Sequence, residues 1–263
     1  MNTEVMTPPE RVALAARLFE RAAAGETVEL TVLSGMERCA LGGTAHALFE
    51  PQVLNAWIEI GDNRRVKAIE LALEGLRERG LLLDDAPEGP KVRAWSVSPE
   101  LGIVLAACER PTYVVATDVD GKTTRCLQFF AVGDIEQPVR AVVVHEPVPL
   151  PPGGSFKHVE NLGPLGWMTR YRLVSEEVAA RIMADVALVS RQDKDGTHPY
   201  NLRRFKHNDG KAVTEAGLSV IGDGTSARVR LFKADPRNPD DAVMVDSDGL
   251  RGLIGRVLAT GAW

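Results

Sequence analysis

The chain has 263 residues, a hydrophobic fraction of 44% and a net charge of −5, a composition typical of a globular protein with one large core or two small ones. The acidic balance argues against a general nucleic-acid-binding surface, and an aromatic fraction of 5% argues against a base-stacking one. The first residues have neither a basic flank nor an apolar stretch, and no apolar run reaches the ~20 residues of a membrane-spanning helix. We therefore expect a cytoplasmic protein without a membrane span.

The first 60 residues predict two helices and one strand. A threonine, two prolines and a glutamate at 7–10 form a typical helix start, and apolar residues then recur at helical spacing over 10–24. Residues 27–33 alternate apolar with polar side chains, which predicts a half-buried strand. A short helix is predicted over 51–60, with a helical turn or two over 45–49 before it.

The clearest pattern follows. An amphipathic helix over 64–79 is predicted to stop at Gly80. A strand over 91–97 comes after a polar turn, and Ser98 then caps a helix that continues to Glu109. This stretch contains no catalytic motif, so it predicts a scaffold.

A helix followed by a turn and a strand is also the arrangement of the recognition helix and wing in winged-helix proteins. A winged-helix DNA-binding transcriptional regulator is therefore the alternative function. A helix that enters the major groove usually presents a positive face, whereas the charges of this helix are balanced. Nucleic acid is thus not the partner that the sequence favours. The charged residues concerned are Arg64, Arg65, Lys67, Arg77 and Arg79 against Glu70, Glu74 and Glu78.

The middle of the chain predicts a sheet. Strands over 113–119, 123–132 and 139–147 are separated by turn residues, which indicates an antiparallel meander. A proline- and glycine-rich loop over 147–164 follows, and a second serine-capped helix is predicted over 175–189.

The segment 190–211 is polar and basic, and its run 203–207 is expected to form a solvated loop, because charge runs are usually exposed. Strands are predicted over 227–233 and 242–246, followed by a final helix over 248–259. Within the basic segment, four neighbouring side chains form a candidate docking site for an acidic partner or a phosphate. These partner-binding candidates are Arg203, Arg204, Phe205 and Lys206.

No cofactor, metal site or enzymatic activity is expected. The histidines lack the short spacings of zinc or iron ligands, and neither a phosphate-binding loop nor a serine nucleophile elbow occurs. A calcium loop beginning at Asp118 fails, because Lys122 and Phe129 stand where acidic ligands are required. An unrecognised enzyme would need a pocket that joins His145 or His198 to a carboxylate.

The three cysteines are odd in number and far apart in the sequence, so neither a disulfide framework nor a zinc site is indicated. Cys108 lies on an apolar helix and Cys126 in an apolar strand. Both are expected to be buried free thiols.

Three short motifs stand in a fixed order along the N-terminal half: Arg79-Gly80-Leu81-Leu82 at the end of a helix over 71–82, Val97-Ser98-Pro99-Glu100-Leu101, and Arg110-Pro111 leading into a strand. With the strands over 128–132 and 141–144 and the closing helix, they resemble the EspG family, the cytosolic chaperones of type VII (ESX) secretion in actinobacteria. The resemblance implies two pseudo-symmetric halves and binding to the helical tips of secreted substrate pairs such as PE/PPE proteins. The helix over 10–24 and the basic segment 190–211 depart from the family pattern.

The sequence therefore predicts an α+β fold with a central, mostly antiparallel sheet flanked by helices. The chain forms either a single domain over 1–263 or two halves, 1–150 and 165–263, joined by the proline- and glycine-rich loop. The expected function is that of a non-enzymatic adaptor or chaperone that binds a protein partner, and the family resemblance implies a type VII secretion substrate.

Overall fold

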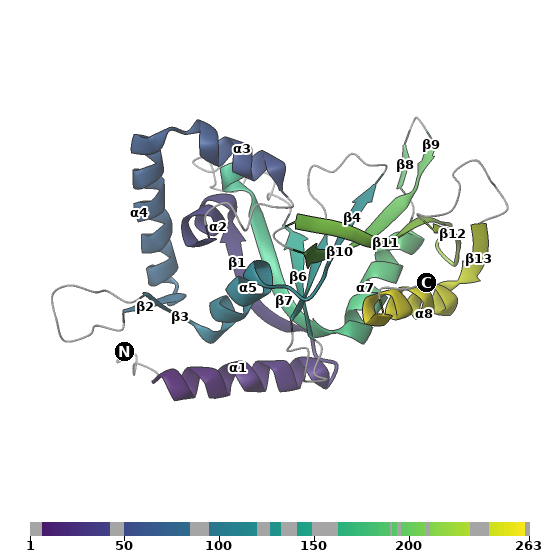
Figure 1. Cartoon of the computed structure of the whole chain (residues 1–263), viewed down its shortest axis with the longest axis horizontal. Helices are drawn as coiled ribbons and strands as arrows, with labels where there is room; N and C mark the ends of the chain where they lie inside the picture. The colour runs from purple at the N-terminus through teal and green to yellow at the C-terminus, as the bar shows by residue number, and fades with distance from the viewer. Residues whose placement is uncertain are drawn as a thin grey trace. The chain divides into compact units, whose positions relative to one another are not determined.

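The computed structural model describes the chain over residues 7–42, 50–84, 95–119, 127–132, 141–148, 163–189, 191–193, 196–208, 211–231 and 242–260 (Figure 1). The expected α+β class, with a mostly antiparallel sheet flanked by helices, is confirmed. The chain divides into two compact units, each assembled from several stretches. Unit 1 comprises Met1–Arg21, Val28–Arg110 and Pro147–Arg172, and unit 2 comprises Ala22–Thr27, Pro111–Glu146 and Leu173–Trp263.

Unit 1 is mainly helical. The strand β1 (Val28–Ser34) is a neighbour of β7 (Met168–Ser175), and a short antiparallel hairpin joins β2 (Leu82–Asp84) to β3 (Trp95–Val97). A small core gathers around Trp57, where Cys39, Val53 and Leu165 are buried. The helical elements are α1 (Pro8–Ala23), α2 (Gly35–Gly42), α3 (Pro51–Glu59), α4 (Asp62–Glu78), α5 (Pro99–Glu109) and the 3₁₀ turn η2 (Gly163–Gly166).

Unit 2 is an antiparallel sheet with two helices on one face. Its strands run in the order β6-β5-β4-β10-β11-β12-β13, and each neighbouring pair is antiparallel. The strands are β4 (Val114–Val119), β5 (Gln128–Val132), β6 (Ala141–Pro147), β10 (Tyr200–Asn208), β11 (Lys211–Gly222), β12 (Ser226–Leu231) and β13 (Ala242–Asp246). A separate hairpin pairs β8 (Arg191–Asp193) with β9 (Gly196–His198).

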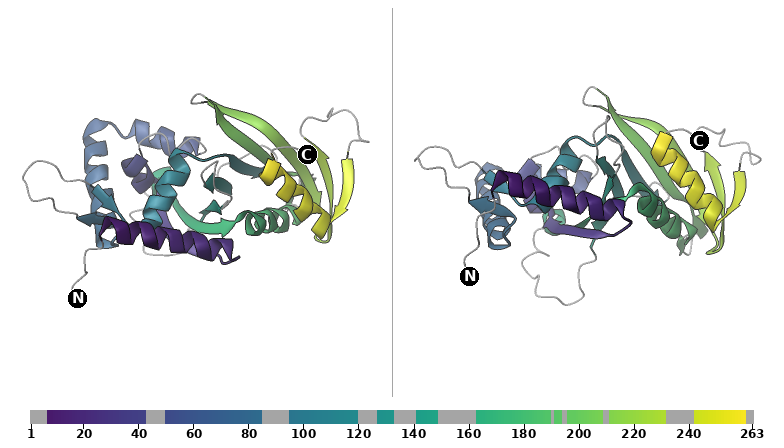
Figure 2. Two further views of the ribbon diagram at one scale, coloured as in Figure 1. Left: turned by 60° about the horizontal axis from the view of Figure 1, so that its bottom comes forward. Right: turned by 90° about the horizontal axis from the view of Figure 1, so that it is seen from below.

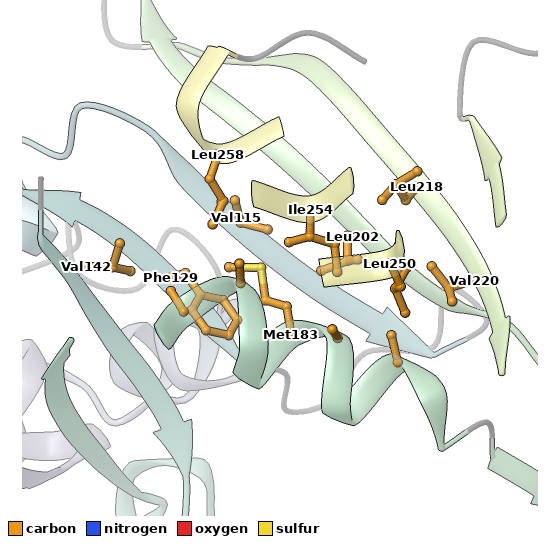
Figure 3. Packing of buried hydrophobic residues seen from close by; sticks show 14 of the residues in the cluster. Val115, Phe129, Val142, Met183, Leu202, Leu218, Val220, Leu250, Ile254 and Leu258 are labelled. Carbon is orange, nitrogen blue, oxygen red and sulfur yellow. The ribbon is translucent and has the colours of Figure 1, made fainter. Parts of the chain in front are cut away.

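The helices α7 (Glu176–Leu188) and α8 (Ser247–Thr260) pack against each other and against this sheet. Figure 2 shows the yellow α8 over the green strands β10–β12, on the same side as α7. In Figure 3, Met183 of α7 and Ile254 of α8 meet Val115, Phe129 and Leu202 of the strands, and all five side chains are buried. We call this helix-covered side the inner face of the sheet.

Several predictions are confirmed. The strands β4, β5 and β6 form the expected meander, and the helices expected over 10–24, 51–60 and 64–79 are present as α1, α3 and α4. Ser98 and Ser175 both cap helices, since each hydroxyl accepts a backbone N–H bond of 3.2 Å three residues later. The turns or loops predicted over 45–49, 84–91, 118–122 and 147–164 fall largely outside the described residues.

The prediction of a solvated loop over 203–207, within the basic segment 190–211, is wrong. The segment contains the β8–β9 hairpin, all of β10 and the start of β11. Tyr200 and Leu202, two residues apart and therefore on one face of β10, are both buried, and so is Asn201 between them. The sheet pairs these two residues with Val220 and Leu218 of β11, so burial on the inner face overrides the polar composition.

No helix within the described ranges is long and apolar enough to cross a membrane.

Candidate functional site

The four partner-binding candidates lie on β10, where strand alternation separates them. Leu202 and Arg204 line a small cavity on the inner face, together with Met183 of α7. Alternation therefore turns Arg203 and Phe205 to the opposite face, where both are half-buried. Lys206 is exposed near the end of the strand. The structure thus does not bring the four side chains into one docking site.

Arg204 has internal partners. The register of β10 and β11 shifts after Arg204, which leaves Glu215 as an extra residue on β11. The Arg204 guanidinium forms an ion pair with Glu215, and its side chain is only 11% exposed. The same guanidinium lies 4.3 Å from the ring centre of Tyr113, a cation–π distance. Arg204 is therefore part of the framework of unit 2.

Tyr113 extends this polar chain to the start of α7. Its hydroxyl donates a 2.8 Å hydrogen bond to Oε1 of Glu176, in the first turn of α7. A carboxylate is favourable at this position because the N-terminus of a helix carries partial positive charge. These contacts link four side chains in series: Glu215, Arg204, Tyr113 and Glu176. They hold the carboxylate of Glu176 in place at the edge of the inner face.

Glu176 lines a groove of about 530 Å³ between α7 and α8, which is the candidate binding site. One end is acidic, with Glu176 and Glu177, while Arg181 and Arg251 supply positive charge. Small and aliphatic residues complete the lining. The full set is Glu176, Glu177, Val178, Ala180, Arg181, Arg251, Gly252 and Gly255.

Two glycines keep this groove open. A Cβ atom built on Gly252 or on Gly255 would meet no atom within 4 Å apart from the backbone of its own helix. Glycine inside a helix costs roughly 0.5–1 kcal/mol relative to alanine, so α8 carries a cost here that no packing within the described chain explains. Within the lining, Arg251 ties the two helices together through a 3.1 Å hydrogen bond to Asp185 of α7.

The groove is chemically suited to binding. Its lining offers carboxylates, guanidiniums and aliphatic groups, and contains neither a histidine nor a thiol. His145 lies instead in β6, is 2% exposed, and stacks on Phe130 with ring centroids 6.2 Å apart. His198 is half-buried in β9. Across the described part of the chain, no three His, Cys, Asp or Glu residues gather where they could hold a metal ion.

The thiols of unit 1 are poor nucleophiles. Burial raises the pKa of Cys39 to about 11 and that of Cys108 to about 12. The side chain of Cys39 is buried. The side chain of Cys108 is half-buried, although the sequence predicted that it would be buried. Cys126 lies outside the described residues.

Arg38, next to Cys39, forms the most buried ion pair described in unit 1. Its guanidinium meets the carboxylate of Glu50, and each side chain is 2% exposed. The Tyr171 hydroxyl is near this pair, and burial raises the pKa of that phenol well above its usual range. Charged groups enclosed in this way are inaccessible to a partner.

The winged-helix arrangement also has a structural counterpart in unit 1. Helix α4 is followed by the β2–β3 hairpin, as a recognition helix is followed by a wing. Arg64 and Lys67 are exposed on α4, but so are Glu70, Glu74 and Glu78. The exposed charge of the helix therefore stays balanced.

No family model matches the sequence, and no curated protein sequence matches it either.

The groove residues escape sequence reasoning because they become neighbours only when α7 and α8 pack together. One signal is present in the sequence: Gly249, Gly252 and Gly255 recur every three residues in the last helix, which places them near one side of it.

Proposed function

We propose that this protein is a non-enzymatic adaptor or chaperone that binds a helical segment of a protein partner in the α7–α8 groove. The observation that carries the proposal is the open floor of the groove at Gly252 and Gly255, where a Cβ atom added to either glycine would have no neighbour within 4 Å apart from the backbone of its own helix. A ligand that fills this space gains contact area along both helices.

A helix is the occupant that fits the lining best. Two packed helices present parallel ridges, and a third helix packs against them at an interaxial distance of about 8–10 Å when the contact residues are small. Ala180, Gly252 and Gly255 are small residues of this kind. Glu177 and Arg181, both exposed, can pair with basic and acidic side chains of the incoming helix.

The resemblance to the EspG chaperones supports the same conclusion and narrows the partner. It favours the helical tip of a secreted substrate pair, which the adaptor would shield before export through a type VII system. The apolar tip of such a pair would otherwise be exposed to water.

Filling the groove tests this function. The protein is co-expressed with helical-pair proteins encoded beside its gene, and the complex is isolated by size-exclusion chromatography. Gly252→Leu and Gly255→Leu place a bulky side chain into the open space, and Thr260→Leu, on the same helix but outside the groove lining, is the matched control. We expect a complex with the wild type and the control, and at least tenfold weaker binding for both glycine variants. Unchanged binding by the glycine variants contradicts the proposed site, and failure of every such pair to bind contradicts the proposed function.

The α4–β2–β3 arrangement makes a winged-helix DNA-binding regulator the second candidate. It predicts salt-dependent binding of duplex DNA that is lost in an Arg64→Glu, Lys67→Glu variant. A flat fluorescence-anisotropy titration with genomic fragments in 50 mM salt excludes it.

A further inference from the structure

Two opposite charges on α7 lie one helical turn apart at the groove. Glu177 and Arg181 are four residues apart, so both project from the same side of the helix, about 6 Å apart along its axis. Both side chains line the groove, and both are exposed. The groove therefore has a polarity along α7, with negative charge near the start of the helix and positive charge one turn later.

Neither of these two charges is neutralised within the described part of the chain. A glutamate followed four residues later by a basic residue can form an ion pair along a helix. Glu177 and Arg181 form no such pair, and no hydrogen bond or ion pair joins either side chain to another residue that the structure describes. Both charges can therefore pair with a ligand that occupies the groove.

The other charged residues of the lining are already engaged. The carboxylate of Glu176 accepts a hydrogen bond from the hydroxyl of Tyr113. Arg251 donates hydrogen bonds to two carboxylates, one on each of the two helices. Glu176 thus adds negative charge beside Glu177, whereas the positive charge of Arg251 is balanced internally. Arg181 is the guanidinium of the lining that an incoming carboxylate can reach without displacing a partner.

We propose that the groove binds selectively a helix that runs antiparallel to α7 and carries an acidic residue followed four positions later by a basic one. This inference rests on the proposed function, because it specifies which helix the groove accepts. The basic residue lies over Glu177 and the acidic one over Arg181, since the two residues of each helix are one turn apart. An apolar side chain on the flank that faces α8 fills the space above Gly252 and Gly255.

Two electrostatic effects determine the direction of the bound helix. In the antiparallel arrangement, the C-terminal end of the ligand helix carries partial negative charge and lies beside the positive N-terminal end of α7. In the same arrangement the acidic residue of the ligand precedes the basic one, which is the order that also stabilises a helix by itself. A parallel helix would need the reverse order and would place like helix ends together.

The test uses the full chain and two fluorescein-labelled 20-residue helical peptides of identical composition. Both carry a leucine stripe. One peptide has glutamate and, four positions later, lysine beside the stripe, and in the other these two residues are exchanged. Fluorescence anisotropy measures the affinity of each peptide at 50 and 300 mM salt. We expect the glutamate-first peptide to bind at least threefold more tightly, with a smaller difference at high salt.

Exchanging the charges on the protein should reverse this preference. The variant Glu177→Arg, Arg181→Glu should bind the lysine-first peptide more tightly, and it should fold because both positions are exposed. The matched control is Arg17→Glu, Glu20→Arg, an exchange of two exposed charges on α1, which should keep the wild-type preference. The inference is overturned if the wild type binds both peptides equally, or if the exchange on α7 does not reverse the preference.

A substitution in the groove separates this inference from the proposed function. Gly255→Leu should weaken the binding of both peptides tenfold or more, because it fills the space that either peptide needs. Equal binding of the two peptides that is lost in Gly255→Leu contradicts the charge pattern and leaves the groove as a helix-binding site. Absence of binding, or binding that Gly255→Leu does not weaken, contradicts the proposed function and this inference together.

Discussion

The guanidinium of Arg204 lies 4.3 Å from the ring centre of Tyr113 while it is ion-paired with Glu215. Glu215→Gln should destabilise unit 2 by about 1–3 kcal/mol, because it leaves a mostly enclosed positive charge without its carboxylate. Arg204→Met keeps the aliphatic packing and removes the charge, so it should cost less.

Urea denaturation of the two single variants and the double variant measures the coupling. The double variant should be more stable than the sum of the single effects implies, by about 0.5–3 kcal/mol. Strict additivity would show that the ion pair contributes nothing to the fold.

The buried pair of Arg38 and Glu50 should have the largest single effect in unit 1. Glu50→Gln leaves the Arg38 side chain, which is 2% exposed, without its carboxylate partner. Breaking a buried ion pair in this way costs about 3–5 kcal/mol. Replacing both residues, as Arg38→Met with Glu50→Leu, should cost less than Glu50→Gln alone. Thermal unfolding followed by circular dichroism ranks the variants, and a double variant less stable than the single one refutes this account.

The raised thiol pKa values predict a loss of stability in alkali. Cys39 and Cys108 titrate near 9 when unfolded but at about 11 and about 12 when folded, so above pH 9 the unfolded state loses protons that the folded state keeps. The free energy of unfolding should therefore fall as pH rises from 9 towards 11. A Cys39→Ala, Cys108→Ala variant should lack this component, and parallel pH profiles for the two proteins would contradict the shifts.

Glycine substitutions should separate open positions from tightly packed ones. Gly252→Ala and Gly255→Ala should each stabilise the protein by about 0.5–1 kcal/mol, since the helix interior favours alanine and the added Cβ meets nothing. Gly222→Ala should destabilise it, because its Cβ would lie 2.2 Å from the carbonyl oxygen of Leu188. Differential scanning calorimetry distinguishes these signs, and destabilisation by Gly252→Ala would mean that the groove is filled.

Local sequence patterns were sufficient to predict the helices α1, α3 and α4 and the meander of β4, β5 and β6. The caps at Ser98 and Ser175 depend on residues within one turn, so the sequence reveals both directly. The pattern does not predict β7, although Thr169, Tyr171 and Leu173 alternate there and are all buried, because arginines stand between them. Polar composition hid the strand in the same way as in β10.

The sites depend on contacts that no local pattern contains. Arg204 contacts Tyr113, which immediately precedes β4, and Glu215 of β11. The basic run around Arg204 in the sequence cannot reveal these internal partners. The groove requires α7 and α8 to pack together. Tertiary packing decides these features.

Hydrogen–deuterium exchange of the protein, alone and mixed with a helical protein that binds it, tests the proposed binding site most directly. If the partner helix lies in the α7–α8 groove, the amides of 176–181 and 251–255 should gain protection in the complex, while those of α4 in unit 1 stay unchanged. Protection confined to α4 and the β2–β3 hairpin, or absent from both groove helices, would contradict the claim.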